Sequence, residues 1–445
     1  MKSVTMISWE FAPFYVRGGT AYAIRRLADQ LTALGIETRV LLPDWPNVDL
    51  GPDLPALLKP IRMPMRTALR DAPPVLQYSE FCRAAVEAVE QTESSFGSDA
   101  VIAHSDHGAM FIVLRRQRRS SAPSVFWLHS LYDPPISDFS SQQRRLLPSE
   151  SLLASTVMMA DIVVTSRGIL KDARDFEWPD RLKKLQQALT IAAAEQRVLT
   201  VESVGCLPAA HNSNGKDSAG SEVENLKDLP LPFVLFPSRP AMAKGFGISA
   251  AIAERLHADK IACVAVRPPA HQASPHTPSR NGHVQWLPWL TQNELTVAMR
   301  AATCTVLPSI TEGFGLTAAE SISLGVPTLY HQVGGHHGLP AIPNALPISL
   351  TTTERARLYR LWSDLSVDHS DSWSIWTKYE ASLKPLADKC VEAIRSVISS
   401  SPTGRNENAP DGEPAMDDEQ WATKLCRRLE MNGALNLECA DLPAL

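Results

Sequence analysis

The stretch TEGFGLTAAES, residues 311–321, carries two glutamates on either side of a glycine-rich turn. Glu312 and Glu320 are eight positions apart, and even a fully helical segment would separate them by about 12 Å along its axis. The two carboxylates that flank one bond in a glycoside hydrolase lie about 5 to 9.5 Å apart. The spacing therefore favours the two ends of a long ligand over one bond or one metal ion.

Two cations follow another predicted strand. In SRPAMAKGFG, Arg239 and Lys244 come between that strand and a predicted helix, with Gly245 and Gly247 beside them. An arginine fork and a lysine point charge can together neutralise a diphosphate. Taken alone, the pair is more simply interpreted as two solvated surface charges.

A glycine pair follows the first predicted strand. Arg17, Gly18 and Gly19 precede a helical segment, so backbone N–H groups could approach an anion at the helix start. The pattern is not G-x-G-x-x-G, and no P-loop lysine follows it, so neither dinucleotide nor P-loop binding is supported. The alternative is a tight turn without a ligand.

Strand-like and helix-like segments alternate along the chain in two series, which predicts an α/β protein with two doubly wound, Rossmann-like domains facing across a cleft. We expect an N-terminal domain at 1–210 and a linker at 211–230. A C-terminal domain should follow at 231–398 and a disordered linker at 399–418. Residues 419–445 should form a helical tail that could pack back on the N-terminal domain. Whether the chain returns to the N-terminal domain near Trp376 or near Trp421 stays open.

Ligands of open α/β sheets bind outside the carboxyl ends of the strands. The residues most suited to chemistry fall at such predicted ends: Gly18, Gly19, His104, Asp106, His129, Arg239, Lys244 and Glu312. We therefore expect them to belong to one site.

Composition excludes several classes of function. A net charge of -5 gives no reason to expect nucleic acid as a partner, and no run of eighteen apolar residues could cross a membrane. The seven cysteines are scattered without a C-x-x-C, which is typical of reduced thiols and predicts no zinc site. No secretory signal is evident, so a cytoplasmic location is expected.

The glutamate motif resembles that of a known family. Glu312 to Pro327 is similar to the E-x7-E motif of retaining glycosyltransferases of the GT-B fold, especially family 4, and Arg239 and Lys244 match their R-x4-K-G segment. In the first half, SWEFAPFYVRGG, AHSDHGAM and FWLHSLYDP resemble segments of glycogen and starch synthases, with Arg17 near their usual lysine. The resemblance covers roughly residues 3–333.

The resemblance implies that the N-terminal domain (1–210) binds the acceptor and the C-terminal domain (231–398) binds the nucleotide sugar. It also implies roles for the matching residues. Glu312 would hold hydroxyls of the donor sugar, Glu320 the ribose, and Arg239 with Lys244 would neutralise the leaving diphosphate. His129 would contact the far hydroxyl of the sugar. The implied catalytic residues are Glu312, Arg239, Lys244 and His129. The implied donor-binding residues are Gly18, Gly19, Arg239, Lys244, Glu312, Gly313, Phe314, Gly315, Leu316, Thr317 and Glu320. The candidates on the acceptor side are Arg17, His104, Asp106 and His107.

The implied reaction moves a sugar from a UDP, GDP or ADP sugar to a small-molecule acceptor, by front-face displacement and without a metal or cofactor. One departure from the family concerns the usual G-G-x-x-E segment, which here reads GGHHGLP and lacks its glutamate. His336 and His337 could touch the acceptor, but we favour a simple loop. Donor, acceptor and oligomeric state are not named by the sequence.

Three alternatives to a transferase remain. A sugar phosphorylase of the same fold would need inorganic phosphate, and a sugar-nucleotide epimerase would need no acceptor. A non-catalytic nucleotide-sugar-binding protein would bind without turnover. The joint presence of Glu312, Arg239 and Lys244 argues against a decayed site.

Overall fold

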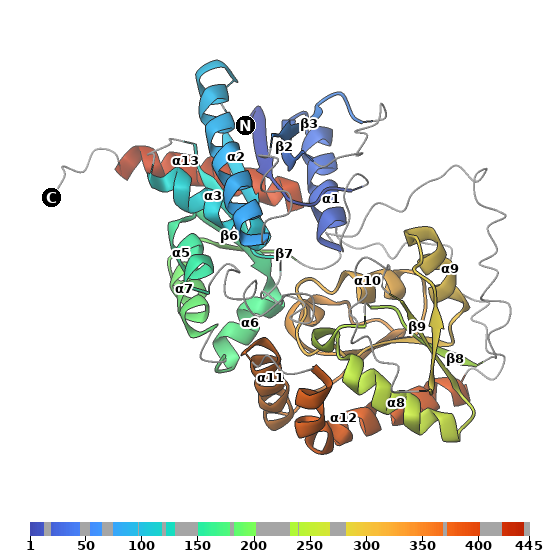
Figure 1. The fold of residues 1–445 in the computed structure, drawn as a ribbon. Helices are drawn as coiled ribbons and strands as arrows, with labels where there is room; N and C mark the ends of the chain where they lie inside the picture. The colour runs from blue at the N-terminus through green and yellow to red at the C-terminus, as the bar shows by residue number, and fades with distance from the viewer. Residues whose placement is uncertain are drawn as a thin grey trace. The chain divides into compact units, whose positions relative to one another are not determined.

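A computed structural model describes residues 1–12, 19–44, 54–64, 74–96, 98–117, 122–129, 150–178, 182–201, 232–238, 240–267, 282–367, 372–400 and 421–439. The chain divides into two compact α/β units. The first holds the elements from β1 to β7 together with helix α13, and the second holds those from β8 to α12 (Figure 1).

The first unit is built on a seven-stranded parallel sheet in the order β3-β2-β1-β4-β5-β6-β7. Its strands are β1 (Ser3–Ile7), β2 (Glu37–Pro43), β3 (Leu58–Met63), β4 (Ala100–His104), β5 (Ser124–Trp127), β6 (Ile162–Ser166) and β7 (Val198–Val201). Its helices are α1 (Gly19–Ala33), α2 (Pro74–Phe96), α3 (Ser105–Gln117), α5 (Glu150–Met159), α6 (Arg167–Asp175), α7 (Lys183–Ala194) and α13 (Trp421–Cys439).

The pattern of burial explains why the central strands are easy to predict. Every residue of β1, β4, β5 and β6 is buried, because the interior of a doubly wound sheet is covered on both faces. The helical segment expected after the glycine pair is confirmed as α1, in which Ile24, Leu27 and Leu31 are buried on one face. Gly35 has a φ of 78°, the left-handed conformation expected just past the end of a helix.

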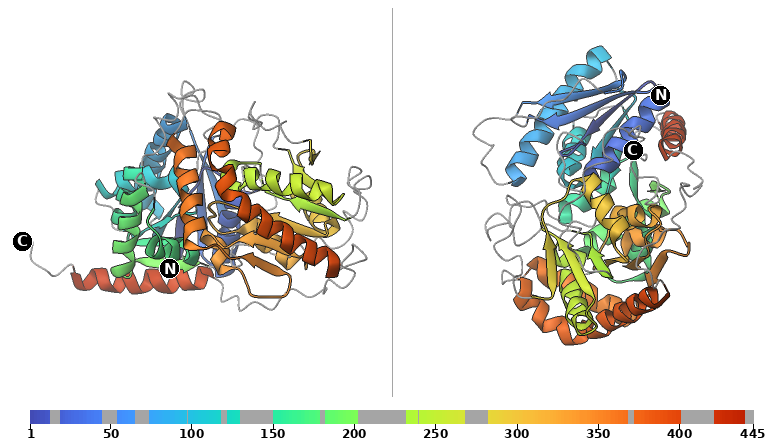
Figure 2. Two further views of the ribbon diagram at one scale, coloured as in Figure 1. Left: turned by 90° about the horizontal axis from the view of Figure 1, so that it is seen from below. Right: turned by 90° about the vertical axis from the view of Figure 1, so that its right-hand side faces the viewer.

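Helix α13 belongs to the first unit, where it packs against α1 (Figure 2). Ala422, Leu425 and Leu429 are buried at helical spacing, which gives α13 one apolar face. The segment after Trp421 is therefore the one that returns to the first unit. Trp376 is buried in the second unit instead, where α12 packs tightly on α8.

The second unit is built on a six-stranded parallel sheet in the order β10-β9-β8-β11-β12-β13. Its strands are β8 (Phe233–Phe236), β9 (Ala262–Val266), β10 (Val284–Leu287), β11 (Cys304–Leu307), β12 (Thr328–His331) and β13 (Ala345–Ile348). Its helices are α8 (Phe246–Ala258), α9 (Gln292–Ala301), α10 (Leu316–Ser323), α11 (Thr352–Val367) and α12 (Ser372–Ser400), with 3-10 turns η6 (Met242–Lys244) and η8 (Gly334–Gly338).

Helices cover both faces of the second sheet. Apolar side chains of α9 pack against β8, β9 and β10, and those of α10 pack against β11 and β12. Figure 1 shows α8 and α12 on the opposite side of this sheet, next to one another. The predicted 211–230 linker lies outside the described residues. Ser399 and Ser400, expected in the second linker, are the last residues of α12.

No helix in the described ranges is long and apolar enough to cross a membrane.

Candidate active site

Both sheets have a point at which the strand order reverses, between β1 and β4 in the first and between β8 and β11 in the second. Loops that leave the carboxyl ends of two such strands turn in opposite directions, and this is where doubly wound sheets bind ligands. Lys244 ends the turn η6 after β8, and Glu312 lies in the loop after β11. The topology therefore explains how two residues that are 68 positions apart meet.

Lys244 and Glu312 form an ion pair. The Lys244 Nζ atom lies 2.8 Å from Glu312 Oε1 and 2.9 Å from Oε2. The Gly313 N–H donates to Oε1 at 3.2 Å, and the Ser309 hydroxyl donates to Oε2 at 3.3 Å. Burial by itself raises the pKa of Glu312, but the charge of Lys244 and the hydrogen bonds from Lys244 and Gly313 hold the pKa below its ordinary value. The carboxylate is therefore ionised at neutral pH.

Backbone contacts connect the two loops that carry this pair. The Ile310 N–H donates to the Ala243 carbonyl at 2.9 Å. Gly245, at the start of α8, has a φ of 75°, and a Cβ atom there would lie 1.9 Å from the Pro308 carbonyl oxygen. Only glycine fits such a backbone contact, so the glycine after Lys244 sets how closely the β8 loop approaches the β11 loop.

The loop from Glu312 ends in the N-terminus of α10. Gly315 precedes the helix with a φ of 68°, and no side chain caps it. The first N–H groups of a helix have no partner within the helix, and they lie at the positive end of its dipole. Phe314 is buried, whereas Leu316 and Thr317 are partly exposed in the first turn. The backbone here is suited to an anionic group.

Glu320 lies one turn into α10 and is partly buried. The side chain of Gln292, the first residue of α9, forms a hydrogen bond with its carboxyl group. Burial raises the pKa of Glu320 to about 7, and the bond from Gln292 opposes this shift. Glu312 and Glu320 thus differ in charge: the first is held ionised by a cation, and the second titrates near neutral pH.

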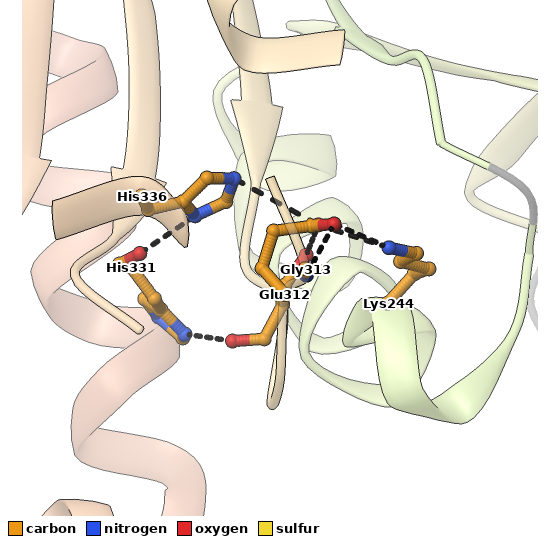
Figure 3. A network of polar contacts seen from close by, with 6 residues as sticks. Lys244, Glu312, Gly313, His331 and His336 are labelled. Carbon is orange, nitrogen blue, oxygen red and sulfur yellow. Dashed lines mark hydrogen bonds and ion pairs between the residues drawn. The ribbon is translucent and has the colours of Figure 1, made fainter. Parts of the chain in front are cut away.

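His336 belongs to this site, and the expectation of a simple loop is wrong for it. It lies in η8, is 1% exposed, and its Nε2 atom is 3.8 Å from Glu312 Oε2 (Figure 3). Its Nδ1 atom lies 2.8 Å from the backbone oxygen of His331. His337 points elsewhere and contacts an Arg355 nitrogen at 3.1 Å. The signal that could have found His336 is the Gly334-Gly335 turn: a Cβ atom on Gly334 would lie 1.9 Å from the Glu312 carbonyl oxygen.

The first unit holds a second polar cluster at the carboxyl ends of β4 and β5, next to its own point of strand reversal. His104 ends β4, and its Nδ1 atom lies 3.0 Å from His129 Nε2, just after β5. The His129 ring stacks on Trp127 with ring centres 4.3 Å apart. Burial lowers the pKa of His104 to about 3, so this ring is neutral at physiological pH. Two candidates from the sequence are thereby brought together.

The residue after His104 is strained. Ser105 has a φ of 58°, which is uncommon for a residue with a side chain, and such strain concentrates at functional sites. Asp106 and His107 follow in the first turn of α3, and nothing is described of their side chains. Gly19 is the first residue of α1. Arg17, Gly18 and Arg239 lie outside the described residues, so their roles stay predictions.

Within the part of the chain that the structure describes, no three His, Cys, Asp or Glu side chains are arranged to hold a metal ion.

Two family models match the chain in sequence. The model for "Glycosyl transferase 4-like domain" matches residues 18–183, and the model for "Glycosyl transferases group 1" matches residues 279–339. The second match includes Glu312, Glu320 and His336. A search of curated protein sequences finds no match to the chain.

Solved structures show the same fold. The catalytic domain of starch synthase IV from Arabidopsis thaliana, bound to ADP and acarbose, has 16% identity and a TM-score of 0.55, over 87% of this chain and 99% of that one. Sucrose-phosphate synthase from Thermosynechococcus elongatus has 17% identity and a TM-score of 0.54, over 90% and 100%. A trehalose-6-phosphate protein from E. coli, bound with UDP-2-fluoro glucose, has 12% identity and a TM-score of 0.52, over 96% and 99%.

The motifs, the two family matches and the two Rossmann-like sheets together identify the chain as a GT-B, family 4-like glycosyltransferase.

Proposed function

We propose that the protein is a cytoplasmic, biosynthetic hexosyltransferase that transfers a sugar from a nucleoside-diphosphate sugar to a small-molecule acceptor with retention of configuration. The observation that carries this proposal is the Lys244–Glu312 pair, set at a point of strand reversal beside the N-terminus of α10. A cation and a helix start suit a diphosphate, and an ionised carboxylate suits sugar hydroxyls. Similar structures contain ADP or a UDP sugar, which supports the same class of donor.

Each end of the donor has its own residues in this proposal. Lys244, together with Arg239, neutralises the diphosphate as it leaves, and Glu312 orients the sugar ring. Glu320 accepts a hydrogen bond from the ribose. Catalysis then consists of positioning and of stabilising the charge that grows on the leaving group.

The first unit supplies the other contacts. His129 bonds a hydroxyl at the far end of the sugar, and Gly19 approaches the diphosphate. His104 and Asp106, with Arg17 and His107, are the candidates that hold the acceptor.

The chemical step is a front-face displacement. The bond between the anomeric carbon and the diphosphate oxygen breaks, and the acceptor oxygen forms its bond to the same carbon on the same face. The proton of the acceptor hydroxyl passes to the departing phosphate. Neither a metal ion nor a covalent enzyme intermediate takes part.

Two measurements test the proposal. Binding of UDP, GDP or ADP should raise the thermal stability, because a ligand at 100 times its Kd adds about 2.7 kcal/mol. With the donor so identified, NMR of the product should show the anomeric configuration of the donor. An inverted product would overturn retention. Turnover that needs inorganic phosphate would indicate a phosphorylase, and conversion of the donor without an acceptor would indicate an epimerase. Binding without turnover over a broad acceptor panel would indicate a binding protein.

A further inference from the structure

His336 has no role in the function proposed above, and its segment departs from the family's usual pattern. The ring is held firmly in the second unit. It lies edge-on to Tyr330, with ring centres 5.3 Å apart and an interplanar angle of 65°. A Cβ atom on Gly315 would lie 2.5 Å from the Cδ2 atom of His336. The ring therefore packs against the turn that leads into α10.

One tautomer of His336 follows from its hydrogen bond. The backbone oxygen of His331 can only accept, so the Nδ1 atom at 2.8 Å must carry a hydrogen. Burial lowers the pKa of the ring, against the opposing effect of Glu312, so the ring is neutral near pH 7. Its Nε2 atom then has a bare lone pair and can only accept a hydrogen bond.

This lone pair lies beside a second acceptor. The Nε2 atom is 3.8 Å from Glu312 Oε2 and forms no hydrogen bond with any described residue. Figure 3 shows the His336 ring and the Lys244 ammonium on either side of the Glu312 carboxylate. A buried acceptor without a donor is unfavourable, and a ligand that brings a hydrogen to each of two neighbouring acceptors would relieve this cost at His336 Nε2.

We propose that His336 and Glu312 form a paired acceptor that selects donor sugars carrying two adjacent free hydroxyls. This inference rests on the proposed function and specifies its substrate class: a neutral hexose with an intact vicinal diol. One hydroxyl donates to the Glu312 carboxylate and its neighbour donates to His336 Nε2. A deoxy or fluoro position removes one of the two hydrogens. A uronic acid that places its carboxylate here is repelled by Glu312.

The wild-type protein provides a first test that needs no variant. Affinity is measured by calorimetry for the UDP, GDP or ADP hexose that it binds, and for the four monodeoxy forms of that hexose. Two adjacent positions should matter. Loss of the hydroxyl that bonds the charged carboxylate should weaken binding about 10- to 100-fold, and loss of its neighbour roughly 2- to 10-fold. Sensitivity at one position only, or at two positions that are not neighbours, would overturn the inference.

Variants then test whether the hydroxyl with the smaller effect on affinity is the one that bonds His336. His336→Phe removes the acceptor and keeps a ring, whereas His336→Gln offers an amide oxygen in its place. His337→Phe is the matched control, because the His337 ring is the adjacent imidazole and contacts Arg355. In His336→Phe, removal of the hydroxyl that bonds His336 should change the affinity by no more than about twofold. Removal of the hydroxyl that bonds Glu312 should weaken binding as much as it does in the wild type. His336→Gln should restore discrimination, and His337→Phe should behave as wild type.

Binding of the nucleoside diphosphate alone separates this inference from the proposed function. All variants should bind it as wild type does, since His336 lies at the sugar end. If His336→Phe binds it normally and still discriminates at both positions, the inference fails and the proposed function stands. If His336→Phe weakens the diphosphate and its hexose equally, the residue has a structural role only. If the wild type binds no nucleoside diphosphate or sugar nucleotide, the proposed function fails, and the inference fails with it.

Discussion

The Lys244–Glu312 cluster and the His104–His129 cluster differ in charge and in burial. In the second unit, Lys244 and Glu312 are both charged, and their side chains are 29% and 11% exposed. In the first unit, His104 and His129 are 1% and 3% exposed, and His104 is kept neutral beside Trp127. A buried charge needs a partner, whereas a neutral imidazole needs only a hydrogen bond.

The difference in charge indicates what each cluster can do. The charged cluster contains a cation and an anion, so it can stabilise charge that develops during a reaction, as when a diphosphate leaves. The neutral cluster can bind hydroxyls without changing its own charge. We therefore expect substitutions in the charged cluster to act on catalysis. Substitutions in the neutral cluster should act on stability and its dependence on pH.

The largest effect is expected for Lys244→Ala. If Lys244 stabilises the departing diphosphate, its loss should reduce kcat about 10²- to 10³-fold, as loss of an oxyanion-hole donor does. Steady-state kinetics with saturating donor measures this. Lys389→Ala is the matched control, because it breaks the Lys389–Glu354 ion pair, which has an N–O distance of 2.7 Å in the same unit. A fall in kcat no larger than that of the control would contradict the role of Lys244.

The next largest effect separates the two glutamates. Glu320→Ala should raise the donor KM, by an amount that corresponds to a loss of roughly 1.5 to 3 kcal/mol of binding free energy. The reason is that a ribose contact is present in both the ground state and the transition state. Glu312→Ala should reduce kcat instead, since the sugar it orients is the group that moves. Ser323→Ala, an exposed change one turn further along α10, serves as the control. A loss of kcat in Glu320→Ala with donor affinity intact would contradict the proposal that Glu312 binds the sugar of the donor and Glu320 its ribose.

The neutral cluster predicts a pH dependence of stability. The pKa of His104 is about 3 in the folded protein against an ordinary value of 6.5, so only the unfolded chain binds the proton between these values. Stability should therefore be full above pH 6.5 and fall as the pH drops toward 3. His104→Phe should flatten this slope in thermal unfolding, and the exposed control His257→Gln should keep it. An unchanged slope in His104→Phe would mean that His104 is not held neutral.

Glu320 should give a smaller slope of opposite sign. Its folded pKa of about 7 lies above the ordinary 4.5, so the folded state binds the proton more tightly. This contribution to stability is present below pH 4.5 and is lost as the pH rises through about 7. Glu320→Gln should therefore gain stability relative to wild type between pH 5 and pH 8, as measured by thermal unfolding. Parallel curves for the two proteins would show that Glu320 does not titrate there.

The smallest effect is expected from chelation. If Lys244 and Arg239 neutralise the diphosphate, a divalent ion is unnecessary, and turnover should survive EDTA. The control is the same assay with added magnesium or manganese. Activity that vanishes with EDTA and returns with magnesium or manganese would show that Lys244 and Arg239 do not suffice to neutralise the diphosphate.

Local pattern alone predicts the α/β class, the doubly wound sheets and the helix after Gly315. The central strands are evident in the sequence because both of their faces are covered, so their residues form buried, mostly apolar runs such as SVTMI and FVLF. Three edge strands, β3, β7 and β13, are harder to find. Many of their residues are partly or fully exposed, and LKPIRM carries a lysine, a proline and an arginine. An edge strand is covered less completely, so its sequence is less constrained.

The candidates Lys244, Glu312, Glu320, His104 and His129 could be named from residue type and spacing along the chain. Which of these residues meet depends on the folded arrangement of the strands. The pairing of Lys244 with Glu312 depends on β8 and β11 being neighbours, and that of His104 with His129 on β4 lying beside β5. His336 acquires its place in the same way, through the turn of Gly334 and Gly335 against the backbone of Glu312 and Gly313. Local sequence encodes the spacing of apolar residues and the ends of each helix and strand. Contacts between distant segments arise only when the sheet has assembled.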